Sequence, residues 1–272
     1  MNLARNRCEP GKKLIFLDFD GTYADDGAVP PGHVAAVRAA RANGHHVFLC
    51  TGRPLSGLSE DVLAEGFDGL VCAAGGYVLI DGQVLADRRF PRDLAEKSLA
   101  VLDSHDGSYI LESPEFVYVL ASGEERLREL FRTHKDMLDR LKVLDSLNDV
   151  EFSKITVLRS RKPIVELAVQ IGDGIQALPG SVEDWGTSSG ELQLADVNKA
   201  IGMDIVARHL GTTVADAIAF GDGLNDLEML AHAGIGVGIE GGSQRVLDVA
   251  DMVAPGPECE GLAIAFAELG LV

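Results

Sequence analysis

The 272-residue sequence predicts an α/β protein: a parallel sheet with helices on both faces, interrupted by an inserted α+β domain. Three observations predict this class. Short apolar runs, suited to buried strands, alternate with stretches of helical periodicity. Three of these runs end abruptly in polar clusters. Between about residues 83 and 188, charged residues become dense, and the strand patterns alternate as in a sheet covered on one face.

The first expected strand, residues 14–17, is followed by Asp18-Phe19-Asp20-Gly21-Thr22. Side chains alternate along a strand, so Asp18 and Asp20 should point the same way. Two carboxylates in one small space repel each other unless a proton or a cation lies between them. The pair indicates an acid/base couple or a magnesium site, although an isolated pair of this kind also commonly just ends a strand and begins a loop.

The next elements repeat the alternation of strand and helix. A strand at 47–50 ends in Thr51-Gly52-Arg53, and a strand is expected at 69–73, with helices at 34–43 and 58–65. Strand, helix and strand in succession imply parallel pairing with right-handed crossovers.

The insert has its own pattern. It begins with an amphipathic helix at 92–105 and a hairpin formed by 109–112 and 116–121, followed by helices at 124–138 and 163–171 and strands at 154–159 and 190–195. We expect the domains to be 1–82 with 189–272, and 83–188. Hinges between them are expected near Gly82 and within 186–190.

The buried pattern returns with a helix at 199–210 and a strand at 217–220, which ends in Gly221-Asp222-Gly223-Leu224-Asn225-Asp226. A helix at 227–233 and strands at 234–239 and 252–253 follow. In a parallel sheet the carboxyl ends of the strands share one edge, where ligands bind. The polar residues that should converge there are Asp18, Asp20, Thr51, Asp222, Asn225 and Asp226.

Bulk properties exclude several partners. With 24 basic and 42 acidic residues, the net charge of −18 argues against nucleic acid and anionic membranes. Cys8, Cys50, Cys72 and Cys259 lack zinc-type spacing and are expected to be reduced thiols. We see no secretory signal in residues 1–13 and no apolar stretch of about 18 residues. These features predict a soluble, cytoplasmic protein. We expect a monomer or a homodimer.

The motifs ending three strands, together with Lys199 at the start of a helix, resemble in order the four motifs of the haloacid dehalogenase superfamily. Only 33 positions separate Asp18 from Thr51, whereas 148 separate Thr51 from Lys199. An insert in the second interval resembles the type II cap of the Cof-like branch, whose members are mostly phosphatases of small phosphate monoesters. Tyr23 differs from the leucine usual in that branch.

The resemblance implies a role for each motif. Asp18 would be the nucleophile that forms an aspartyl-phosphate, and Asp20 the general acid and base. Thr51 would offer its hydroxyl and its backbone N–H to the phosphate. The expected phosphate-binding residues are Thr51, Gly52, Lys199 and Asn225; the expected Mg²⁺ ligands are Asp18, Asp20 through its backbone carbonyl, Asp222 and Asp226, the last directly or from the next shell.

The expected function is therefore magnesium-dependent hydrolysis of a small phosphorylated metabolite, with a sugar phosphate as the first candidate. A phosphomutase or phosphotransferase would carry the same four motifs. A receiver-like signalling module also uses an aspartyl-phosphate, but it would be about half as long and would lack the insert. Steady release of inorganic phosphate, without a sugar bisphosphate, would separate a phosphatase from both.

Overall fold

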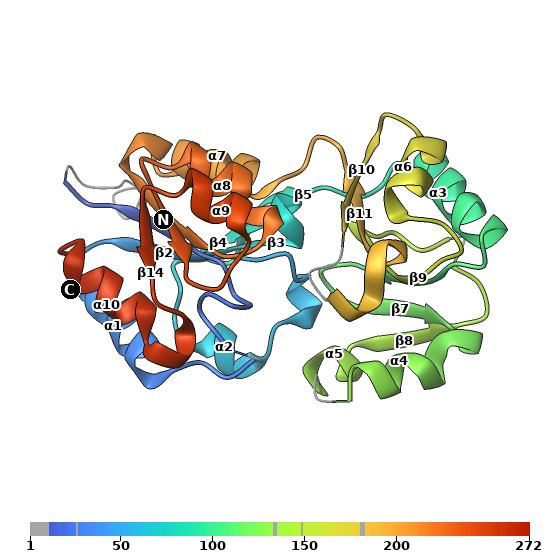
Figure 1. The fold of residues 1–272 in the computed structure, drawn as a ribbon, viewed down its shortest axis with the longest axis horizontal. Coiled ribbons are helices and arrows are strands. Elements are labelled where there is room, and N and C mark those ends of the chain that lie inside the picture. Colours follow the sequence, from blue (N-terminus) through green and yellow to red (C-terminus); the bar gives the residue numbers. More distant parts are fainter. Residues whose placement is uncertain (1–10, 26, 133–134, 148, 180–182) are drawn as a thin grey trace. The chain divides into compact units, whose positions relative to one another are not determined.

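The computed structural model describes residues 11–25, 27–132, 135–147, 149–179 and 183–272. The chain forms two compact units, which Figure 1 shows in the colours of the sequence. The first comprises Met1–Gly52, Asp61–Ala86 and Asn198–Val272, and the second comprises Arg53–Glu60 and Asp87–Val197. The chain therefore passes between the units four times, whereas the sequence suggested two connections.

The unit boundaries also fall later in the chain than residues 82 and 188. Strand β5 (Gln83–Asp87) pairs in the sheet of the first unit, through a two-residue turn at Asp81 and Gly82, both with positive φ. Strand β11 (Gly190–Leu194) belongs to the sheet of the second unit. Strand pairing therefore places both domain boundaries several residues later in the chain than the sequence suggested.

The first unit is built on an eight-stranded sheet, in the order β14-β13-β12-β1-β2-β3-β4-β5. Strand β1 lies inside the sheet and pairs in parallel with β12 and β2, as the Rossmann-like prediction requires. Strand β4 pairs antiparallel with β3 and was not predicted. The other bounds are β1 (Leu14–Leu17), β2 (His46–Cys50), β3 (Gly69–Cys72), β4 (Tyr77–Ile80), β12 (Ala217–Gly221), β13 (Ile235–Ile239) and β14 (Met252–Ala254).

Helices cover both faces of this sheet, because every strand of its centre is apolar on both sides. On one face, Leu14 and Phe16 share a core with Met203 of α7 and Leu230 of α8. On the other face α1 packs against α10, and the rings of Phe220 and Phe266 lie 5.4 Å apart. The helices are α1 (Pro31–Ala42), α2 (Glu60–Ala64), α7 (Lys199–His209), α8 (Leu227–His232), α9 (Gln244–Val249) and α10 (Gly261–Glu268).

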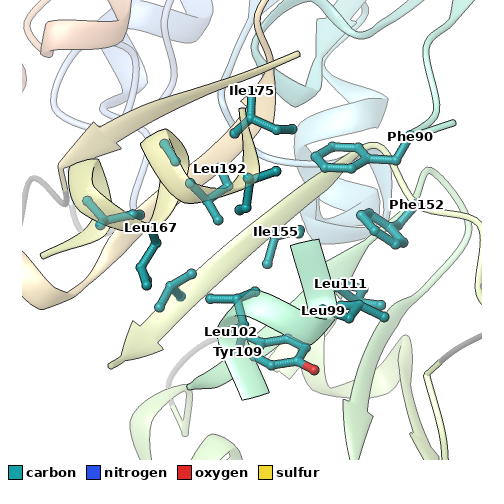
Figure 2. Close-up of a cluster of buried hydrophobic side chains, with 14 of the residues drawn as sticks. Phe90, Leu99, Leu102, Tyr109, Leu111, Phe152, Ile155, Leu167, Ile175 and Leu192 are labelled. Atoms are coloured by element: carbon teal, nitrogen blue, oxygen red, sulfur yellow. The ribbon is translucent and has the colours of Figure 1, made fainter. Parts of the chain in front are cut away.

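The second unit contains a six-stranded sheet in the order β10-β11-β9-β6-β7-β8, antiparallel except for the β7–β8 pair. Helices α3 and α6 cover one face over the core shown in Figure 2, which includes Leu99, Tyr109, Ile155 and Leu167. The elements are α3 (Arg92–Ser104), β6 (Ser108–Glu112), β7 (Val117–Leu120), α4 (Glu124–Leu130), α5 (Lys135–Asp139), β8 (Leu141–Leu144), β9 (Lys154–Arg159), α6 (Ile164–Ile171) and β10 (Ile175–Pro179).

Two expectations for this unit were wrong. The single helix expected over 124–138 is two helices, because α4 ends at Leu130 and α5 begins at Lys135, with 133–134 outside the described residues. Strands β8 and β10 were missed. The hairpin of β6 and β7 is confirmed.

Three of the cysteines are free thiols: Cys50 and Cys72 are buried, and Cys259 is exposed. Cys8 lies outside the described residues. In the described part of the chain, no helix combines the length and the apolar character needed to cross a membrane.

Candidate active site

Asp18 is fixed by the end of β1. Its backbone N–H donates to the carbonyl of Phe220 at 3.0 Å, which extends the pairing of β1 with β12 by one residue. The chain then turns, with φ of +80° at Gly21 and with the N–H of Tyr23 donating to the carbonyls of Asp18 and Phe19. The carboxylate of Asp18 is therefore held at the carboxyl edge of the sheet, where its side chain is buried.

Lys199 joins Asp18 to the fourth motif. Its Nζ lies 2.5 Å from Oδ1 of Asp18 and 2.5 Å from Oδ1 of Asp226, and its side chain is completely buried. Asn198 caps helix α7 by accepting the N–H of Ile201 at 2.9 Å. A Cβ on Gly75 would lie 2.0 Å from the carbonyl of Asn198, so only glycine allows this approach.

The two acids of the fourth motif support each other. Asp226 accepts the backbone N–H groups of Asp222 and Gly223 through Oδ2, at 3.1 and 2.9 Å. Asp222 accepts the hydroxyl of Thr22 at 3.0 Å. A Cβ on Gly21 would lie 2.6 Å from a carboxylate oxygen of Asp222. The close approach of the fourth motif to the first therefore requires glycine at this position.

These contacts bring three carboxylates together. One oxygen each from Asp18, Asp222 and Asp226 lies within 4.8 Å of the others. Burial, reinforced by Asp226, raises the pKa of Asp18 well above its usual range and that of Asp222 to about 6. Burial opposes the charge of Lys199, but Asp18 and Asp226 outweigh it and raise the lysine pKa. One ammonium thus faces three acids, which leaves the site short of positive charge.

A hard divalent cation fits this donor set. Mg²⁺ binds oxygen ligands at about 2.0–2.1 Å, so ligand oxygens around one ion lie about 3–4 Å apart. The three carboxylates are therefore close enough to share an ion after small side-chain adjustments.

The remaining predicted residues lie beside this group with less direct contact. Thr51 is buried after β2, the neighbour of β1, but its N–H donates to the carbonyl of Val71 at 2.8 Å. The expectation that this N–H binds phosphate is therefore wrong, and the role of the Thr51 hydroxyl stays a prediction. Gly52 follows Thr51 and is the last residue of the segment Met1–Gly52 of the first unit.

Asp20 is more exposed than the other acids of the motifs, whereas Asn225 is half-buried like Asp222. Asp20 is exposed and forms a bridge with Ala24, and among the described residues its carboxylate does not belong to the three-carboxylate group. Asn225 is half-buried in the turn Leu224–Asp226. Asp20 is therefore accessible to solvent.

Sequence reasoning assigned no role to Thr22, Asn198 or Ser243, which position the acids and the lysine. Asn198 carried a local signal, since asparagine before a helix commonly caps it. Ser243 donates its N–H to the carbonyl of Asp222 at 2.8 Å across 21 residues of sequence, a contact that no local pattern indicates.

Comparison with known proteins agrees with this geometry. A family model described as haloacid dehalogenase-like hydrolase matches residues 15–266. The chain is 27% identical to the putative phosphatase YkrA of Bacillus subtilis, covering 96% of this chain and 98% of that one. It is 37% identical to a phosphoglycolate phosphatase of Archaeoglobus fulgidus, with coverage of 96% and 98%.

The fold matches that of a solved structure, the subclass IIB sugar phosphatase BT4131. The TM-score is 0.82 at 22% identity, with 96% of this chain and 100% of that chain covered. The family model, which spans nearly the whole chain, and the relatives of equal length lead to one conclusion: the chain belongs to the haloacid dehalogenase-like hydrolase family.

Proposed function

We propose that the chain is a magnesium-dependent phosphatase that hydrolyses a small phosphate monoester by way of a phosphorylated Asp18. The observation that carries the proposal is the placement of the Asp18 carboxylate beside Lys199 and within 4.8 Å of Asp222 and Asp226. The family and the phosphatase relatives support the same reaction class.

The balance of charge determines whether the Asp18 carboxylate can attack a phosphate ester. A phosphate monoester dianion repels an anionic nucleophile, so a carboxylate attacks only where cations offset the phosphoryl oxygens. Asp18, Asp222 and Asp226, with the backbone carbonyl of Asp20, would hold Mg²⁺. When bound, the ion neutralises charge on the phosphoryl group. Lys199 adds a fixed ammonium next to the nucleophile.

The proposed reaction has two steps, in which Asp18 and Asp20 take part. Asp18 attacks phosphorus and the bond to the leaving oxygen breaks, while Asp20 donates a proton to that oxygen. Asp20 next takes a proton from a water molecule that attacks the phosphorus of phospho-Asp18, which releases phosphate and restores both acids. The Thr51 hydroxyl would donate to a phosphoryl oxygen, with Gly52 and Asn225 beside it.

Two similar proteins support a substrate class for the chain. One relative is named for phosphoglycolate, and a protein of the same fold is a sugar phosphatase. We propose a phosphorylated sugar or related polyol as the substrate. A phosphomutase would use the same phosphorylated Asp18, so free phosphate must be measured directly.

The test separates Asp18 from Asp20 by rapid-quench labelling with an aryl phosphate. Asp18→Asn should abolish turnover and labelling. Asp20→Asn should accumulate labelled enzyme, because a good leaving group needs no proton in the first step whereas water still needs a base in the second. Asp216→Asn, an exposed acid that precedes the first residue of β12, at the end of the strand opposite to Asp222, is the control and should behave as wild type. Two inactive variants without label would refute these roles.

Metal dependence is tested on the wild-type protein. EDTA should abolish phosphate release, and added Mg²⁺ should restore it, because three acids and a phosphate face a single lysine. Undiminished turnover after chelation would contradict the proposed role of the cation.

A further inference from the structure

The turn that carries Asp20 is closed by its own backbone. The N–H of Gly21 donates to the carbonyl of Ala24 at 2.9 Å, and the N–H of Ala24 donates to the carbonyl of Phe19 at 2.8 Å. Tyr23 also lies in this turn and is completely buried, whereas Asp20 is exposed. The position of Asp20 in the turn therefore depends on what holds Tyr23 and Ala24 in place.

His33 of α1 holds the backbone of Tyr23. Its Nδ1 lies 2.9 Å from the carbonyl oxygen of Tyr23, and its Nε2 lies 3.2 Å from the backbone nitrogen of Leu262, in the first turn of α10. A carbonyl accepts and a backbone N–H donates, so Nδ1 carries the proton and Nε2 accepts. The ring is therefore neutral. Burial favours this state and lowers the pKa of His33 below its ordinary 6.5, although the Tyr23 carbonyl and Glu260 oppose it.

Contacts between α1 and α10 fix the position of His33. The two helices lie side by side in the first unit (Figure 1), and His33 is completely buried. Oε1 of Glu260, the residue before α10, accepts the N–H of Gly32 in the first turn of α1 at 3.2 Å. Each helix thus provides an acceptor for an N–H in the first turn of the other. These paired contacts hold the imidazole where it meets the Tyr23 carbonyl.

The side chain of Tyr23 has contacts of its own. Its ring centroid lies 6.1 Å from that of His33 and 5.3 Å from that of Phe67, and its hydroxyl donates to Glu65. The leucine that is usual at this position in the Cof-like branch could not make the last contact. Packing and the hydroxyl therefore fix the Tyr23 side chain, while His33 fixes the carbonyl through which the chain leaves the turn.

We propose that His33 is a positioning residue for the general acid, because its hydrogen bond to the Tyr23 carbonyl sets the place of the turn that carries Asp20. The inference rests on the proposed phosphatase function and adds to it a residue outside the four motifs. Asp20 would give its proton to the leaving oxygen as the bond from that oxygen to phosphorus breaks, so a displaced Asp20 slows leaving groups that need the proton. Asp18 is held separately, by the pairing of its N–H with β12, and should still attack.

The experiment compares His33→Asn with His33→Gln, two uncharged variants that each keep one contact. Asparagine carries its amide nitrogen at the position of Nδ1, near the Tyr23 carbonyl, whereas glutamine carries its amide at the position of Nε2, near the N–H of Leu262. We expect His33→Gln to lower kcat/KM for glucose 6-phosphate by roughly 10- to 100-fold. It should lower kcat/KM for 4-nitrophenyl phosphate far less, because nitrophenolate leaves without a proton. His33→Asn should keep the wild-type ratio of the two values.

His45→Gln is the matched control and should keep the wild-type ratio. Nδ1 of His45 accepts the N–H of Lys13 at 3.0 Å, just before β1 begins and thus at the end of the strand opposite to Asp18. Circular dichroism verifies folding, and His33→Ser, whose hydroxyl is one bond too short to replace Nδ1, takes the place of His33→Gln if that variant unfolds.

Three results would overturn the inference. The folded variant without the Tyr23 contact could keep the wild-type ratio, it could lose both activities equally, or His33→Asn could lose glucose 6-phosphate turnover to the same extent. If wild type releases phosphate from neither ester, the proposed function itself fails, which is a result distinct from an unchanged ratio.

Discussion

Each unit contains a buried lysine between two acids, and the two groups are held differently. Lys199 bridges Asp18 and Asp226, which lie in loops at the ends of strands and are fixed by backbone N–H groups. Lys154 bridges Glu112 and Glu191, which lie on strands beside its own. Loops that follow parallel strands can bring side chains from distant motifs close together in space. Side chains on paired strands instead lie side by side on one face of the sheet.

The groups also differ in charge balance. Asp222 joins Asp18 and Asp226 as a third acid within 4.8 Å, so the Lys199 group can accept a divalent cation. The Lys154 group has two acids, and Glu191 is 26% exposed, so its charge is partly solvated. The two groups therefore share the same ion pairing but differ in the number of acids that surround the lysine.

The largest contrast is expected from removing each lysine. Lys199→Met and Lys154→Met should each reduce the free energy of unfolding by about 3–5 kcal/mol, because each leaves buried acids unpaired. Lys199→Met should also lower kcat for 4-nitrophenyl phosphate by about 10²- to 10³-fold, since positive charge next to the nucleophile is lost. Lys154→Met should lower it far less.

Urea unfolding and steady-state kinetics measure the two effects separately. Lys13→Met is the control, because its 3.5 Å pair with Asp216 is exposed and should contribute less than about 1 kcal/mol. Equal losses of aryl phosphate turnover in Lys199→Met and Lys154→Met would remove the functional distinction between the two groups.

A smaller contrast is expected from two matched threonines. Thr22 donates to Asp222 and Thr156 donates to Glu112, each at 3.0 Å. Replacing either by valine should destabilise the protein by about 1.5–3 kcal/mol, as expected for a hydrogen bond to a charged acceptor. Only Thr22→Val should raise the Mg²⁺ concentration for half-maximal activity, by about 10- to 100-fold, because Thr22 orients a proposed metal ligand.

Magnesium titration of phosphate release distinguishes the two variants. If Thr156→Val shifted the requirement as much as Thr22→Val, the cation would not belong specifically to the Lys199 group. If neither shifted it, Asp222 would not need Thr22 for orientation.

The sequence could predict one of these groups and not the other, for a physical reason. Asp18, Lys199, Asp222 and Asp226 sit in motifs where apolar strands end, so the parallel fold alone brings them to one edge. Glu112 and Lys154 meet because β6 and β9 pair in a specific antiparallel register, although 42 residues separate them. Periodicity predicts that these strands exist but does not indicate which residues lie opposite each other.

The limits of local sequence signals also explain the errors in the predicted fold. The helix expected over 124–138 has continuous helical spacing, and nothing in that spacing marks the end of α4 at Leu130. Strand β8 is only four residues long and has one exposed and three half-buried positions, so its apolar pattern is weak. The extra passes at Gly52 and Glu60 depend on tertiary contacts such as Ser56 to Ser113. The position of residues 53–60 in the second unit is therefore an effect of long-range packing, which local patterns do not indicate.

The smallest expected effect is a pH dependence that identifies the state of Glu112. Burial raises the pKa of Glu112 above its ordinary 4.5, and Glu191 adds to this although Lys154 opposes it. Between 4.5 and the raised pKa, the folded protein binds more protons at Glu112 than the unfolded chain does. The contribution of Glu112 to stability must therefore decrease as pH rises through this window.

Glu115 gives a control of opposite sign. Partial burial raises its pKa, but hydrogen bonds from Arg89 and Ser113 outweigh that effect and lower it below 4.5. Urea unfolding across pH 3–8 would compare wild type with Glu112→Gln and with Glu115→Gln. The stability advantage of wild type over Glu112→Gln should shrink as pH rises above 4.5, whereas its advantage over Glu115→Gln should shrink as pH falls below 4.5. If the two differences changed in the same direction, the attraction of Lys154 would outweigh burial at Glu112, which would contradict the expected direction of the Glu112 pKa.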